Sequence, residues 1–129
     1  MEKLELLRDA YKPNEADIQK SIEYFLGLKG IFCWPTHAGQ IIPVSRGISD
    51  IIGVLPNGRI IAIEVKLPSW RPPKEGTKAF KHYFKQLEFI EKIRKWHGIA
   101  FFASSVEEVK DQLEIVRPPV SRLDPSAID

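Results

Sequence analysis

Two carboxylates and a lysine flank a short turn between two runs rich in β-branched residues. Asp50 lies near the start of the run Ile48–Leu55, and Glu64 and Lys66 lie near the end of the run Arg59–Leu67. Paired carboxylates bind hard divalent cations such as Mg²⁺ or Mn²⁺, which keep several waters and take further oxygens from a substrate phosphate. A neighbouring ammonium group can orient or activate a water and offset the charge that develops at phosphorus. These residue types therefore suit phosphoryl chemistry, provided that the two acids meet.

The turn at residues 56–58, with the sequence Pro-Asn-Gly, decides whether the acids meet. A two-residue Asn-Gly turn would place Asp50 and Glu64 on opposite faces of the hairpin. Proline suits the first position of a type I turn, and the glycine then takes the left-handed bulge position of a three-residue loop. Such a loop pairs Leu55 with Arg59 and sets Asp50 directly opposite Glu64, with β-carbons about 5 Å apart. The sequence therefore predicts that the two acids share one face.

A plain surface hairpin is the alternative interpretation of this pattern. Lys66 follows Glu64 by two residues on the same face, so the two charges could simply offset each other. However, two carboxylates that face each other across a ladder repel, which gives a purely structural sheet little reason to pair them. A bound divalent cation removes that conflict.

The elements around the hairpin predict an α/β domain in which helices flank a small mixed β-sheet. The predicted helices span 14–28, 78–96 and 105 to about 114, the predicted strands span 31–34, 40–44, 48–55, 59–67 and 99–103, and an amphipathic stretch covers 2–11. A capping box at Ser105 and Glu108 is expected to open the last helix. The side chains expected to face the core include Phe80, Tyr83, Phe84, Leu87, Ile90 and Ile93 of the second long helix, and Cys33 and Trp34 of the first strand.

Length and composition limit the class of protein. The chain has 129 residues, of which 43% are hydrophobic and 28% charged, and this suits one packed core. We expect a single domain over 1–116 and a proline-bearing C-terminal tail over 117–129. The N-terminal residues carry acids where a signal peptide has a basic cap, and no apolar run reaches the length of a membrane span. A cytoplasmic or nucleoid-associated protein, neither secreted nor in a membrane, is therefore expected.

The order of the site residues resembles the PD-(D/E)XK nuclease superfamily and, more narrowly, its virus-type replication-repair nuclease (VRR-NUC) domain. The resemblance rests on Gly47–Asp50, on Glu64–Lys66 at the end of an apolar strand, and on Gln86 inside the following helix. Together and in this order these motifs are fairly specific. The resemblance implies a restriction-endonuclease-like core.

Flanking segments extend the resemblance from about Glu15 to Ala103. The connection His37–Gly39 and the closing segment Trp96–Gly98 support it. Ser49 departs from the superfamily signature, which often has proline at this position.

The resemblance also implies roles for the residues of the hairpin. Asp50 and Glu64 would bind the Mg²⁺ or Mn²⁺ ion, and the backbone carbonyl of Val65 would be a further ligand. Lys66 would serve the attacking water. With Glu15 and Gln86, these residues form the expected catalytic set.

Helical wheels test Glu15 and Gln86 independently. At about 100° per residue Glu15 falls between Ile22 and Leu26, so we expect it to point toward the sheet, where it is a further candidate metal ligand. Gln86 lies at the edge of a buried stripe, from which it could reach Lys66, a water or a phosphate. The alternatives are a first-turn acid that interacts with the helix dipole, and a glutamine that bonds a strand end.

Basic residues concentrate in the segment 66–97. It holds nine Lys/Arg and three Glu, although the net charge of the whole chain is only +2. Such regional charge is typical of a surface that binds a polyanion, and a solvated lysine-rich surface is the alternative. The candidate nucleic-acid contacts are Arg46, Arg71, Lys74, Lys78, Lys81, Lys85 and His37, with Trp70 as a candidate wedge.

The resemblance implies a Mg²⁺- or Mn²⁺-dependent endodeoxyribonuclease that hydrolyses phosphodiester bonds. Its expected substrate is duplex or branched DNA, such as a Holliday junction or a flap in replication and repair. A junction-resolving enzyme needs two active sites, so a homodimer is expected for that substrate. The alternatives are a nuclease subunit of a restriction or phage DNA-processing complex, and a DNA-binding module that does not cleave.

Overall fold

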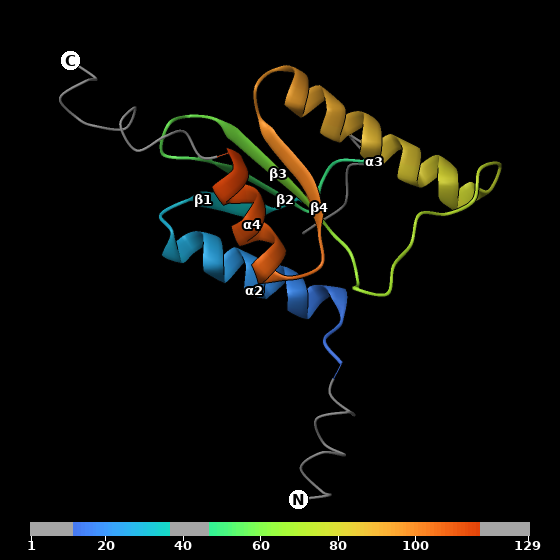
Figure 1. Cartoon of the computed structure of the whole chain (residues 1–129), viewed down its shortest axis with the longest axis horizontal. Coiled ribbons are helices and arrows are strands. Elements are labelled where there is room, and N and C mark those ends of the chain that lie inside the picture. Colours follow the sequence, from blue (N-terminus) through green and yellow to red (C-terminus); the bar gives the residue numbers. More distant parts are fainter. Residues whose placement is uncertain (1–11, 37–46, 117–129) are drawn as a thin grey trace, which may run out of the picture.

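The computed structural model describes residues 12–36 and 47–116 (Figure 1). Their elements are α2 (Glu15–Leu28), β1 (Phe32–Pro35), β2 (Ile51–Val54), β3 (Ile60–Val65), α3 (Lys78–Lys95), β4 (Ile99–Ala103) and α4 (Val106–Val116). The predicted helices and strands in this range are confirmed, although the two hairpin strands are shorter than expected. The amphipathic stretch 2–11, the strand 40–44, the tail 117–129 and the candidates His37 and Arg46 lie outside the described residues.

Side-chain caps explain where the helices begin. Asn14 and Asp17 form a reciprocal capping box at the start of α2, and the hydroxyl of Thr77 accepts the amide of Phe80 over 3.0 Å at the start of α3. At α4 only half of the predicted box forms. The Ser105 hydroxyl accepts the Glu108 amide over 3.2 Å, but the Glu108 carboxylate accepts the amide of Ser104 instead of that of Ser105.

The strands form one mixed sheet in the order β1-β2-β3-β4. β1, β2 and β3 pair antiparallel, whereas β3 and β4 pair parallel and are joined by the crossover through α3. Every residue of β3 from Ile61 to Val65 is buried. A charged residue in this central strand, Glu64, therefore lies in the interior of the molecule.

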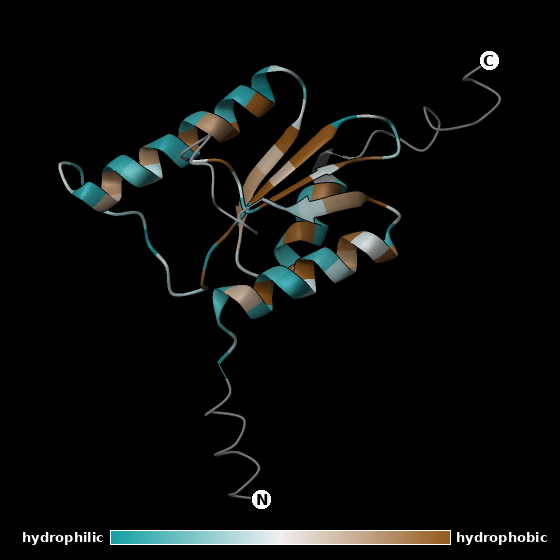
Figure 2. Ribbon diagram, turned by 180° about the vertical axis from the view of Figure 1, so that it is seen from behind, coloured by the Kyte–Doolittle hydropathy of each residue, from teal (hydrophilic) through white to brown (hydrophobic). Residues whose placement is uncertain are grey.

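Helices cover the sheet on both faces (Figure 1). α2 and α4 pack on one face over a core that includes Ile22, Ile61 and Val109. α3 packs on the other face over a smaller core of Ala62, Ile90 and Ala100. Figure 2 shows the strands as the most apolar layer. None of the helices in 12–36 and 47–116 is long and apolar enough to cross a membrane.

For two residues the predicted core position is wrong. Phe84 is 51% exposed and Trp34 is 39% exposed. α3 sits on β3 and β4 through Gln86 and Ile90, and this places Phe84 on the side of the helix away from the sheet. Trp34 lies on the edge strand β1, where its ring packs against Phe32 at 5.2 Å instead of against a covering helix.

Candidate active site

The β2–β3 hairpin sets Asp50 and Glu64 opposite each other. Ile51 pairs with Ile63 in the antiparallel ladder, so the next pair toward the open end of the hairpin is Asp50 with Glu64. Residues opposite each other in such a ladder point to the same face. The predicted register is therefore confirmed, and both acids face the side of the sheet that carries α3.

The three-residue loop predicted from the Pro-Asn-Gly sequence closes the hairpin. The amide of Leu55 donates to the carbonyl of Arg59 over 2.8 Å, and the amide of Gly58 donates to the carbonyl of Leu55 over 2.8 Å. Gly58 has a φ of 89°, a left-handed conformation that a side chain would strain. The turn chemistry thus fixes the register that brings the acids together.

Hydrogen bonds on both sides hold Asp50 in place. Its carboxylate Oδ2 accepts the backbone amide of Val65 over 2.8 Å. On the other side the amide of Thr36 donates to the Asp50 carbonyl over 3.0 Å, and the Thr36 hydroxyl donates to the carbonyl of Ser49. The carboxylate is therefore held against β3 while its backbone is clamped to the end of β1.

A close backbone contact ties the chain before Asp50 to helix α3. Gly47 has a φ of 88°, and a β-carbon at this position would lie 2.6 Å from the backbone carbonyl group of Lys85. Only glycine fits such an approach without displacing one of the two segments. The position of Asp50 therefore depends on the docking of α3.

Glu64 is the buried acid of the site. Glu64 is 4% exposed. Its Oε1 accepts a hydrogen bond from the side-chain amide nitrogen of Gln86 over 2.7 Å. Its Oε2 is buried and accepts no hydrogen bond in the part of the chain that the structure describes. A buried carboxylate oxygen without a partner is costly, so this atom is available for a proton or a cation.

The surroundings of Glu64 strongly favour its protonated form. Burial, and after it the negative charge of Asp50, raise the pKa of Glu64 from 4.5 to about 9. A hydrogen bond with the Asp50 carboxyl group and the charge of Glu15 act in the same direction, and the positive charge of Lys66 opposes them. Without another cation, the carboxyl pair therefore holds a proton at neutral pH.

Lys66 is directed toward Glu64 by polar and aromatic contacts. Its Nζ donates to Oε1 of Gln86 over 3.0 Å and lies 3.8 Å from Oε1 of Glu64. The same ammonium group lies 4.9 Å from the ring centre of Trp70 and 5.9 Å from that of Phe102. Aromatic faces attract a cation without binding its protons, so Lys66 keeps donor capacity for a water or an anion.

Gln86 joins the two charged residues through one amide group. It donates to Glu64 and accepts from Lys66, and the residue itself is 4% exposed. The sequence left several partners open for Gln86. The structure shows the contact with Lys66 and a contact with a strand residue, Glu64. This arrangement also fixes which way the amide points, because a reversed amide would set its oxygen against the Glu64 carboxylate.

The sequence reasoning missed His82. Its Nε2 lies 3.3 Å from the amide nitrogen of Gln86, so the imidazole nitrogen acts as an acceptor there. His82 precedes Gln86 by four residues and therefore lies on the same side of α3. That spacing was the available signal for its position.

Glu15 is exposed to solvent, contrary to the expectation from the sequence. Its side chain is exposed at the first turn of α2, although its charge reaches Glu64. In 12–36 and 47–116 no three His, Cys, Asp or Glu side chains are close enough together to hold a metal ion. The helical wheel does not take into account that a residue in the first turn of a helix can remain in contact with solvent, as Glu15 does.

The chemistry of the pair fits a hard divalent cation. Two carboxyl groups share the site, and Oε2 of Glu64 is a buried oxygen that needs a positive partner. Mg²⁺ and Mn²⁺ accept two carboxylates and fill their other positions with waters and phosphate oxygens. Asp50 and Glu64 are therefore the side chains that could hold such an ion, and the carbonyl of Val65 remains the further ligand that was expected from the sequence.

The predicted basic contacts in the described range lie at the surface. Arg71 is exposed, and its Nη1 donates to the carbonyls of Pro68 and Trp70 over 3.0 and 2.8 Å. The side chains of Lys74, Lys78, Lys81 and Lys85 are also exposed. Lys78, His82 and Gln86 follow one another at intervals of four residues, so this row along α3 leads toward the acids.

The chain matches no protein-family model, no curated protein and no solved structure.

Proposed function

We propose that this chain is a Mg²⁺- or Mn²⁺-dependent nuclease that hydrolyses phosphodiester bonds in DNA, and that its α/β core is restriction-endonuclease-like. The observation that carries the proposal is the carboxyl pair formed by the buried Glu64 and the half-buried Asp50. Glu64 lies in the central strand and faces Asp50. One of its oxygens is bonded to Gln86, and the other accepts no hydrogen bond from residues 12–36 or 47–116. A group that is so costly to bury is typical of a site that binds a cation.

Each residue of the site has a role in this chemistry. Asp50 and Glu64, with the carbonyl of Val65, would hold the cation, which would offset the charge of the phosphate and lower the pKa of a water. Lys66 directs its ammonium group into the same space, where it can donate to the attacking water or to a phosphate oxygen. Gln86 keeps Lys66 and Glu64 in register through its two hydrogen bonds.

The choice of DNA as substrate rests on the positive surface beside the acids. Exposed lysines follow the loop and α3 up to the site, and they carry the charge that a phosphate backbone requires. Because such contacts read no bases, we propose selection by DNA structure, with a flap or a Holliday junction as the substrate. Cleavage of both strands of a junction needs two sites, so the proposal includes a homodimer for that substrate.

Cleavage of labelled DNA tests the proposal directly. Duplex, flap and four-way junction substrates are incubated with the protein in Mg²⁺, in Mn²⁺ and in EDTA. We expect cleavage of at least one substrate with a metal, none in EDTA, and none by Asp50→Asn or Glu64→Gln. Lys66→Ala should still bind Mn²⁺ but lose cleavage.

Matched controls come from helix α4, on the opposite face of the sheet. Glu107→Gln and Asp111→Asn make the same chemical changes at exposed positions and should cleave like the wild type. Cleavage by the Asp50 or Glu64 variants at the wild-type rate would refute the site assignment. Tight DNA binding with no cleavage of any substrate in either metal would favour the non-cleaving DNA-binding module.

A further inference from the structure

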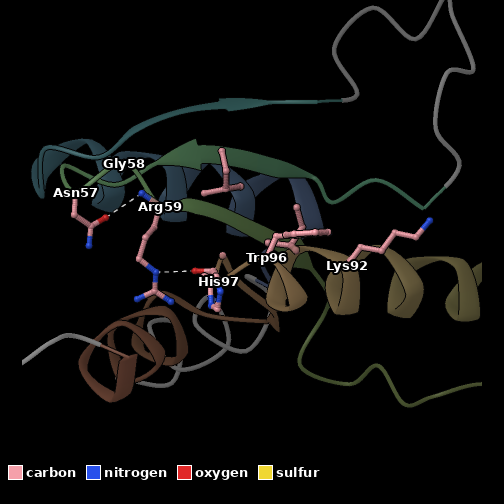
Figure 3. A pocket seen from close by; sticks show the side chains of 9 residues that line it. Asn57, Gly58, Arg59, Lys92, Trp96 and His97 are labelled. Carbon is pink, nitrogen blue, oxygen red and sulfur yellow. Dashed lines mark hydrogen bonds between the residues drawn. The ribbon is translucent and has the colours of Figure 1, made fainter.

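A pocket of about 520 Å³ lies away from the acids, at the tip of the β2–β3 hairpin (Figure 3). Its walls come from residues 57–60 of the hairpin and from residues in 92–98 at the C-terminal end of α3. Arg59 and Lys92 are the arginine and lysine of the lining, and none of the lining residues in the described part of the chain is acidic. A pocket of this size and sign suits a small anionic ligand.

Trp96 gives the pocket an exposed aromatic surface. The residue is 77% exposed although tryptophan usually buries its ring. It follows the last residue of α3, and Nζ of Lys95 lies 5.9 Å from its ring centre. An exposed indole beside cationic groups is typical of surfaces on which nucleobases stack.

Arg59 is held against His97, the residue after Trp96, at an unusual backbone conformation. Its Nε donates to the carbonyl of His97 over 2.8 Å (Figure 3). His97 has a φ of 70°, which costs energy for a residue with a side chain. With Nε bound to a carbonyl, the two terminal nitrogens of the guanidinium group are the ones that can bind a phosphate in a forked arrangement.

We infer that this pocket binds an unpaired nucleotide of a nucleic-acid strand. The base stacks on the indole of Trp96, and Arg59 contacts the phosphate. An unpaired nucleotide is required because a base inside a duplex has no free face. The identity of the strand rests on the proposed function, since it would be the strand that also passes the acids.

The geometry of β3 connects the two sites. Glu64 and Ile60 lie on the same strand and the same face, and Ile60 lines the pocket. Four residues of strand span about 13 Å, which corresponds to about four stacked nucleotides. Because α3 covers Ala62 between the two sites, a single strand would have to pass around the helix, and an extension of at least about four nucleotides beyond the cleaved bond would be needed to reach Trp96.

Fluorescence anisotropy of a labelled twelve-nucleotide oligo(dT), measured in EDTA, tests the inference without any cleavage. Trp96→Ala should weaken binding by about five- to hundredfold, the range measured for loss of one stacked base. Trp96→Phe should keep most of the wild-type affinity. Arg59→Ala should reduce the slope of log affinity against log salt concentration by about 0.7. Tyr24→Ala, which removes a 71% exposed aromatic ring from α2, is the matched control and should bind like the wild type.

A second measurement keeps the protein unchanged. The wild type should bind an abasic oligonucleotide of equal charge more weakly than oligo(dT), while Trp96→Ala should not distinguish them. Equal binding of both oligonucleotides by the wild type would overturn the inference. So would a Trp96→Ala variant that binds oligo(dT) normally but changes its sedimentation, because the pocket would then belong to a contact between copies.

These outcomes separate the inference from the proposed function. Metal-dependent cleavage with no effect of Trp96→Ala on oligo(dT) binding refutes the stacking pocket and leaves the nuclease. Loss of oligo(dT) binding in Trp96→Ala without any cleavage by the wild type supports the pocket and refutes the nuclease.

Discussion

The side-chain nitrogen of Gln86 lies 2.7 Å from Oε1 of Glu64, so a single amide on α3 holds the buried carboxylate of β3. Oε1 of the same amide accepts a hydrogen bond from Lys66 over 3.0 Å. The hairpin brings the acids together, but the helix completes their surroundings. Substitutions in the β2–β3 hairpin should therefore affect the pairing of the acids, and substitutions in α3 should affect the groups that surround them.

Replacement of Gln86 by leucine should destabilise the protein by about 1–3 kcal/mol, because Glu64 and Lys66 each lose a buried partner. His82→Ala removes an exposed side chain and should cost less than about 0.5 kcal/mol. Urea unfolding of both variants checks the difference. Equal losses would mean that the Gln86 amide is not what stabilises the buried carboxyl group.

Stability without metal should fall as the pH rises. The pKa of Glu64 is about 9 in the folded protein against 4.5 as its ordinary value, so the folded state holds one proton more between these limits. The stabilisation that comes from this proton is complete below about pH 4.5. As the pH rises toward 9 it is lost, and the free energy of unfolding falls by at most about 1.4 kcal/mol per pH unit. Urea unfolding in EDTA at pH 6, 7 and 8 measures the slope.

The Glu64→Gln variant should remove this part of the pH dependence and exceed the wild type in stability at pH 8. Glu107→Gln at the surface of α4 is the control and should keep the wild-type slope. Identical slopes in wild type and Glu64→Gln would contradict the pKa shift.

Binding of Mn²⁺ should release about one proton near neutral pH, since the ion must displace the proton held by the carboxyl pair. Calorimetry in two buffers with different ionisation enthalpies measures the released proton. Neither Asp50→Asn nor Glu64→Gln should bind the ion with wild-type affinity. Binding without proton release would show that Mn²⁺ binds elsewhere.

Two glycine substitutions test the turn. Gly58→Ala should cost about 1–2 kcal/mol because of its left-handed backbone, although a β-carbon would meet no atom within 4 Å. Gly27→Ala in α2 also meets no atom within 4 Å but has a helical backbone, and it should stabilise by about 0.5–1 kcal/mol. Opposite signs in thermal or urea unfolding are expected, and equal signs would contradict the turn geometry.

The lysines of α3 should contribute to DNA affinity through charge alone. If Lys78 and Lys81 each neutralise one phosphate, their double alanine variant should flatten the plot of log affinity against log salt by nearly 2 for a duplex. Lys20→Ala with Lys110→Ala removes two exposed lysines from the other helices and should leave the slope unchanged. An unchanged slope in the Lys78 and Lys81 variant would mean that these two lysines belong to a solvated surface that does not contact DNA.

Local chemistry explains which parts of the structure were predictable. The Pro-Asn-Gly turn determines its own geometry, so the pairing of Asp50 with Glu64 followed from three neighbouring residues. The order of the helices and strands followed from periodicity in the same way. These features depend on residues close together in the sequence.

Contacts between distant segments were not predictable in this way. The helical wheel of α3 has apolar residues on more than one side. Phe84 is exposed and Gln86 is buried because of where the helix packs on β3 and β4. Glu15 is exposed because it lies at the first turn of α2, a position that the wheel does not weigh. The close approach of Gly47 to Lys85 has no local signal either.

The burial of Glu64 also has a consequence for folding kinetics. A hairpin with a short loop closes within about 1–10 μs, while the Glu64 side chain is still in water and ionised at neutral pH. Glu64 meets Gln86 only when α3 docks, 22 residues further along the chain. Uptake of the proton by the carboxyl pair therefore belongs to the docking of the helix, which makes the late step of folding, and not the early one, sensitive to pH.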